Sequence, residues 1–111
     1  MIVNKTTNKV LVKHSILANS ILKKMFGFIF KSKTDLGIVF IFNIEKKLNF
    51  HTWFMRFDLD FIFLDENYKV KSIVRNVKPW KLGITGVGKY VVEVPAGKSR
   101  KTKINDKISF I

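Results

Sequence analysis

Residues 51–64 read HTWFMRFDLDFIFL, and this stretch decides the expected fold. Its second half, Leu59–Leu64, is an apolar run of strand length that only Asp60 interrupts, and turn-forming residues follow it at positions 65–67. Residues Tyr68–Val74 then alternate between polar and apolar, which is typical of a strand that pairs back as a hairpin. We therefore expect a β domain organised around this stretch.

Other segments carry strand, helix and loop patterns on either side of the hairpin. One short helix is predicted from Ser20, a typical N-cap, to Phe26, with Gly27 at the position that ends helices. Residues 77–89 hold Pro79 and three glycines, which predicts a flexible loop. Further strands are predicted at Val10–Leu17, Ile38–Phe42, Tyr90–Val94 and Lys107–Phe110.

Length and composition place these elements in one domain. The chain has 111 residues, and 47% of them are hydrophobic, including eleven Phe, so a core is expected without covalent staples. Many short strands separated by turn signals favour a barrel or a sandwich. The prediction is a mainly β, single-domain protein over residues 1–111, with a small β-barrel-like or sandwich fold and one short α-helix.

The residue types that are missing limit the chemistry and the location. Cysteine is absent, which excludes disulfides, thiolate zinc sites and a cysteine nucleophile. The longest apolar run, Gly37–Phe42, is far shorter than the roughly 20 residues that span a bilayer, and the first residues lack an apolar signal region. We therefore expect a cytoplasmic protein that makes no use of a membrane.

The chain is strongly basic, with a formal net charge of +13. Such a charge attracts nucleic acid, but eighteen of the twenty-one cations are Lys, whereas Arg is favoured for bidentate phosphate and base contacts. The Lys residues are also spread along the chain, with modest clusters such as Lys98–Lys103. A solvated Lys surface is the favoured interpretation, and nucleic-acid binding through it is the alternative.

The sequence contains no complete motif for a known cofactor. Gly97-Lys98-Ser99 matches the end of a phosphate-binding P-loop, but Val92 stands where that motif needs its first glycine. No paired-Cys or His-Glu-x-x-His spacing supports a zinc site. Neither a cofactor nor a metal is therefore predicted.

The segment around His51 holds the candidate site residues. In an extended strand His51, Trp53 and Met55 share one face, whereas Arg56 lies on the other. Asp58 and Asp60 follow closely, and a His beside carboxylates can act as a general base. The competing interpretation is structural, with Asp60 hydrogen-bonded to backbone at a strand junction.

Glu93 is the second candidate, because it is the one acid in an otherwise apolar strand. Carboxylates are rarely buried unless they are paired, so a partner such as Arg56, Lys89 or a cation would be needed. The alternation of a strand equally allows Glu93 to point out of the sheet.

Together, five motifs in order resemble the domain-of-unknown-function family 192, also called uncharacterised protein family 0127. The resemblance covers about residues 11–110, and its most recognisable part is His51–Asp60 followed by Phe63-Leu64-Asp65. Asp58 departs from the pattern, since Pro is usual there. The other motifs are Ala18-Asn19-Ser20 with Gly27-Phe28-Ile29, Gly37–Phe42, Val92–Gly97 and the Asn105-Asp106 turn. The resemblance implies a small β-barrel-like domain with one short helix and implies no established activity.

The function is therefore unknown, and a small soluble binding module is the leading hypothesis. Its aromatic and polar cleft would take a small polar ligand or a peptide. The alternative is a hydrolase or metal-assisted enzyme that uses His51 with Asp58 or Asp60; it is less favoured, because neither an adjacent nucleophile nor a third metal ligand is evident. The predicted ligand-binding residues are His51, Trp53, Met55, Arg56, Asp60 and Glu93.

Overall fold

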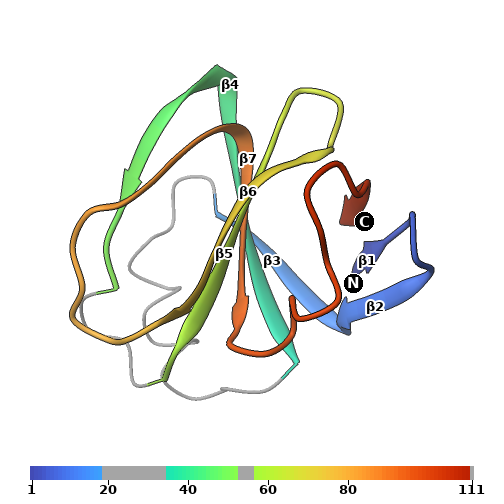
Figure 1. Ribbon diagram of the computed structural model, residues 1–111, viewed down its shortest axis with the longest axis horizontal. Helices are drawn as coiled ribbons and strands as arrows, with labels where there is room; N and C mark the ends of the chain where they lie inside the picture. The colour runs from blue at the N-terminus through green and yellow to red at the C-terminus, as the bar shows by residue number, and fades with distance from the viewer. Residues whose placement is uncertain (19–34, 53–56, 111) are drawn as a thin grey trace.

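The computed structural model describes residues 1–18, 35–52 and 57–110 of the chain, and within them all regular elements are strands (Figure 1). They form a two-layer arrangement of one five-stranded and one three-stranded sheet. The mainly β prediction is therefore confirmed. The strands are β1 (Ile2–Asn4), β2 (Lys9–Val12), β3 (His14–Ala18), β4 (Leu36–Phe50), β5 (Leu59–Leu64), β6 (Val70–Val77), β7 (Ile84–Pro95) and β8 (Ile108–Phe110).

The larger sheet has the strand order β3-β4-β7-β5-β6. β7 lies in its centre and pairs antiparallel with both β4 and β5, while β3 joins β4 in parallel. The sheet ends at β3 and β6, so it does not close into a barrel. The smaller sheet has the order β2-β1-β8 and is antiparallel throughout.

Both faces of the larger sheet are buried around β5, in which all six residues are buried. Phe61 and Phe63 belong to an aromatic-rich cluster on one face. Ile62 and Leu64 join a cluster on the other face that also includes Ile2, Val12 and Ile108 of the smaller sheet. The smaller sheet therefore covers part of that second face, and the predicted strand Leu59–Leu64 is the best-buried element described.

The predicted single strand Val10–Leu17 is wrong, because the chain changes sheet within it. β2 belongs to the smaller sheet and β3 to the larger one. The exposed Lys13 lies between them, and its backbone N–H donates to the Asp35 carboxylate at 3.1 Å. The chain thus turns at Lys13, where the Asp35 side chain holds the backbone, and does not form the one continuous strand that the β-branched residues suggested.

The predicted loop over residues 77–89 is also wrong in its second half, which forms the start of β7. Gly86 and Gly88 pair with Leu48 and Lys46 of β4. A Cβ on Gly86 would lie 2.7 Å from ring carbons of Phe63, and one on Gly88 would lie 2.9 Å from the Leu64 carbonyl oxygen. These two glycines therefore permit close packing in a strand, whereas the sequence pattern had suggested flexibility.

Replacing Gly86 with alanine is expected to lower the free energy of unfolding by about 1–3 kcal/mol, the usual cost of overpacking a core. The Phe63 ring is completely buried, so it would have to shift against packed neighbours to admit the added methyl group. Urea denaturation measures the change. Thr85→Ala is the control: this exposed neighbour in β7 should cost no more than about 1 kcal/mol. An equal loss in both variants would contradict the packing role of Gly86.

The predicted helix from Ser20 to Phe26 lies outside the described residues. Within residues 1–18, 35–52 and 57–110, no helix is long and apolar enough to cross a membrane.

Candidate functional site

The six predicted site residues divide into three groups. Trp53, Met55 and Arg56 lie outside the described residues, so the aromatic cleft around His51 stays a prediction. His51 is exposed, directly after β4. Asp60 and Glu93 lie on opposite faces of the larger sheet, because Asp60 is opposite Val94 and Phe61 is opposite Glu93 in the β5–β7 ladder. The sheet therefore separates the two predicted acids.

Asp60 is a buried structural anchor. It is only 1% exposed, and its carboxylate accepts hydrogen bonds from the backbone N–H groups of Asn76, Gly97 and Ser99, at 2.9, 3.1 and 3.4 Å. The Ser99 hydroxyl donates a further bond at 2.7 Å. These bonds tie β5 to the end of β6 and to the segment that follows β7. The structural interpretation of Asp60 thus has direct geometric support.

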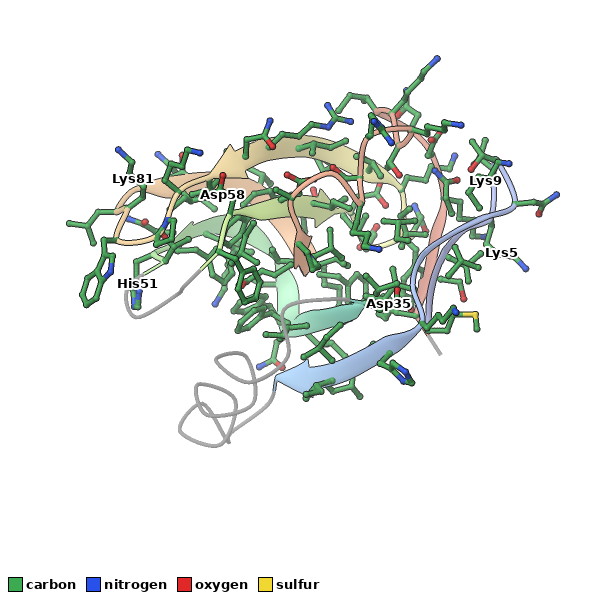
Figure 2. The ribbon with its side chains drawn as sticks, turned by 90° about the horizontal axis from the view of Figure 1, so that it is seen from below. Lys5, Lys9, Asp35, His51, Asp58 and Lys81 are labelled. Atoms are coloured by element: carbon green, nitrogen blue, oxygen red, sulfur yellow. The ribbon has the colours of Figure 1, made fainter. Side chains whose placement is uncertain are left out.

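Asp58, which was considered as a partner of His51, forms an ion pair with Lys78, with 2.7 Å between the carboxylate and the ammonium group. Figure 2 shows His51 near one end of the molecule and Asp58 nearer its middle. Among the described residues, no group of three or more His, Cys, Asp or Glu side chains is arranged to hold a metal ion.

Glu93 is a buried acid on the aromatic-rich face of the larger sheet. It is 8% exposed, and its partners in the ladders, Ile38 and Phe61, are both apolar. Burial raises the pKa of the Glu93 carboxyl to about 8, because the ionised form loses its hydration. Glu93 is therefore mainly protonated at neutral pH. Its burial excludes the interpretation that it points out of the sheet into solvent, while pairing with Arg56 stays a prediction because Arg56 lies outside the described residues.

The Asp60 anchor fixes the most basic stretch of the described chain, Gly97–Lys103, which we call the basic loop. The Arg75 guanidinium on β6 donates to the Ser99 and Thr102 carbonyl oxygens at 3.1 and 2.6 Å. The buried Asp106 carboxylate accepts from the Lys103 backbone N–H at 2.9 Å. The loop is thus held at both ends and in its middle, while it exposes its four cations, Lys98, Arg100, Lys101 and Lys103.

A pocket of about 230 Å³ lies between the basic loop and the segment that runs from the β1–β2 turn into β2. Four cationic residues line it, together with two threonines, whereas none of its described lining residues is acidic. We call it the basic pocket. Its lining residues are Thr7, Lys9, Val10, Leu11, Gly97, Lys98, Arg100, Lys101 and Thr102.

Carboxylates offset part of the charge of the basic loop, and six of the eight in the chain have a partner among the described residues. Three of the six form ion pairs, Asp35 with Lys98, Glu45 with Lys71 and Asp58 with Lys78. The other three, Asp60, Asp65 and Asp106, accept hydrogen bonds from backbone or side-chain groups. Three of these carboxylates, Asp35, Asp60 and Asp106, contact the basic loop, so its charge is partly offset, and Lys98 is ion-paired with Asp35.

The sequence pattern indicated the cation cluster Lys98–Lys103 but not the residues that hold it in place. Lys9 and Arg75 are distant in sequence and join the basic loop only through the tertiary fold. The one available signal was the density of cations between Gly97 and Lys103, which a solvated surface explains equally well.

Comparison with known proteins gives a family described as uncharacterised. The model of the family DUF192, described as "Uncharacterized ACR", matches residues 2–110. A UPF0127 protein of Pyrococcus horikoshii is 35% identical, over 99% of this chain and 98% of its own. A UPF0127 protein of Thermococcus sibiricus is 33% identical, over 87% of this chain and 64% of its own.

A solved structure shares the fold. The crystal structure of a protein of unknown function from Novosphingobium aromaticivorans superposes with a TM-score of 0.73. The match covers 86% of this chain and 74% of that one, at 23% sequence identity.

Proposed function

We propose a function for this chain, which belongs to the uncharacterised DUF192 family, on the basis of its own geometry. The protein is a small binding module that holds a phosphate-bearing ligand in the basic pocket. This proposal keeps the binding-module hypothesis and moves the site from the His51 segment to the basic loop.

One observation supports the proposal: four cationic residues line a pocket whose described lining residues include no acid, and three of the four belong to a loop that Asp60 and Arg75 hold in place. Charge-assisted hydrogen bonds from Lys and Arg to phosphate are about twice as strong as neutral ones. Because Asp60 and Arg75 already fix the backbone, a ligand would have little loop ordering to bring about. The pocket volume of about 230 Å³ suits a phosphate group with a small part of its carrier.

Calorimetric titration with sodium tripolyphosphate tests the proposal. We expect binding at low ionic strength, with an affinity that falls as salt is added. The double variant Arg100→Gln/Lys101→Gln should weaken binding about tenfold or more, because it removes two of the four cations. Both side chains are exposed, so the variant should keep the stability of the parent chain.

Lys47→Gln is the matched control. Lys47 is exposed and lies opposite Val87, near the end of β7 that is remote from Gly97. It should bind tripolyphosphate like the parent chain. Absence of binding by the parent, or an equal loss in Lys47→Gln, would overturn the proposal, since the second result means that any surface charge suffices.

A further inference from the structure

An exposed aromatic side chain, that of Trp80, is held on a hydrogen-bonded turn at residues 78–82. The buried Thr52 clamps this turn through four hydrogen bonds. Its hydroxyl donates to the Lys78 carbonyl oxygen at 2.7 Å and accepts from the Lys81 N–H at 2.9 Å. Its backbone N–H donates to the Lys81 carbonyl oxygen, and its carbonyl oxygen accepts from the Trp80 N–H, both at 2.9 Å.

The clamp presents apolar surface to solvent. Trp80 is 61% exposed and Leu82 is 67% exposed. Trp80 also has a φ of 64°, in the left-handed region that bulky residues seldom occupy. Tertiary hydrogen bonds therefore maintain an uncommon backbone conformation that directs a large indole ring outward.

Cations accompany this ring. Lys78 and Lys81 are exposed on the same turn, and Lys78 retains one ion pair, with Asp58. Figure 2 shows Lys81 at one end of the long dimension of the molecule and Lys9, which lines the basic pocket, at the other. The longest extent of the molecule is 31 Å, so one extended ligand can reach both sites.

From this arrangement we infer that the phosphate-bearing ligand is single-stranded nucleic acid, whose phosphates occupy the basic pocket and one of whose bases stacks on Trp80. The inference rests on the proposed function and adds the class of the ligand. Single strands are bound by cations that follow the backbone and by aromatic rings that stack on bases, and every base offers a face for stacking. Duplex recognition is less suited, because Arg is the commonest reader of base edges. Of the two arginines described, Arg75 is already used to hold the basic loop, which leaves Arg100.

Fluorescence anisotropy with a labelled oligothymidylate of about 12 nucleotides, a length within the range of single-strand sites, tests the inference. We expect binding at low salt, with a linear fall of the logarithm of affinity against the logarithm of salt concentration. Trp80→Ala should weaken oligothymidylate binding about tenfold, within the usual contribution of one stacked base. It should leave tripolyphosphate binding unchanged, because Trp80 does not line the basic pocket. Trp80→Phe should restore most of the lost affinity, since it restores an aromatic face.

The control is Ile44→Ala, which truncates an equally exposed apolar side chain (64%) on β4 and should bind like the parent. The inference is overturned if Trp80→Ala binds oligothymidylate normally, or if a duplex of the same length or heparin binds as tightly. Trp80-dependent binding to phosphatidylcholine–phosphatidylserine vesicles without oligothymidylate binding would also overturn it. Tripolyphosphate binding without oligothymidylate binding refutes this inference alone, whereas loss of both refutes the proposed function as well.

Discussion

Replacing Asp60 with alanine is expected to lower the free energy of unfolding by about 3–5 kcal/mol. The substitution leaves the backbone N–H groups of Asn76 and Gly97 and the hydroxyl group of Ser99 without their acceptor. The Ser99 hydroxyl is buried and the other two donors are partly buried, and a buried donor that loses its partner costs about 1–3 kcal/mol. Since small domains have a total stability of only about 5–15 kcal/mol, this single change would consume much of the margin.

The measurement is the urea midpoint followed by fluorescence or circular dichroism. Asp58→Ala is the control: it removes a carboxylate two residues away whose ion pair with Lys78 is partly exposed, and such pairs contribute only about 0–1 kcal/mol. If Asp60→Ala costs no more than Asp58→Ala, Asp60 is not the anchor described here. Asp60→Asn should be milder, because its amide oxygen can still accept from the Asn76 N–H. It allows tripolyphosphate binding to be measured on a folded chain, and we expect weaker binding because the basic loop loses part of its support.

The second large effect is a loss of stability with rising pH that depends on Glu93. The folded-state pKa of Glu93 is raised to about 8 by burial, compared with an ordinary value of 4.5. Below pH 4.5 the carboxyl is protonated in both the folded and the unfolded chain. Between pH 4.5 and 8 only the unfolded chain ionises, so the free energy of unfolding falls with rising pH by up to about 1.4 kcal/mol per unit. Above pH 8 both forms are ionised, and this contribution levels off.

Glu93→Gln should remove this slope, because glutamine keeps the shape of the side chain and does not ionise. Urea denaturation at unit steps from pH 5 to pH 9 compares the variant with the parent, and the difference between the two profiles isolates Glu93 from the histidines. The control is Glu66→Gln, an exposed acid on the β5–β6 turn, which should keep the slope of the parent. Identical profiles for the parent and Glu93→Gln would show that Glu93 does not lose its charge on folding.

The fold could be predicted from the sequence wherever a local pattern and a buried strand coincide. Leu59–Leu64 forms β5 as predicted, and Tyr90–Val94 lies within β7, because each run is of strand length and apolar except for one acid, as expected of a strand buried between other elements. The glycines of β7 misled the prediction because their role depends on Phe63, a residue 23 positions away in sequence and adjacent only across the sheet.

The site was harder to predict for the same physical reason. Asp60 was recognised as a polar residue in an apolar strand, and its structural interpretation was considered. Its partners Gly97 and Ser99, however, are brought to it by the β5–β7 register, which no local pattern contains. Arg75 resembles any exposed cation of an alternating strand until the fold places the Ser99 and Thr102 carbonyl oxygens beside it. Trp80 was included in a loop without a role, because exposure cannot be read from a residue name.

The smaller sheet also bears on how the protein is made. β1 pairs with β2 early in the sequence, yet its other partner is β8, and the Asn4 side chain donates to Asp106 at 2.8 Å across 102 positions. At a synthesis rate of about 5–20 residues per second, β1 waits roughly 5–20 seconds for β8 to emerge from the ribosome. During that interval Ile2 and Val3 have one open ladder edge, which is a pairing site for other nascent strands. Emergence of β8, rather than local strand formation, thus sets the earliest moment at which this edge is protected.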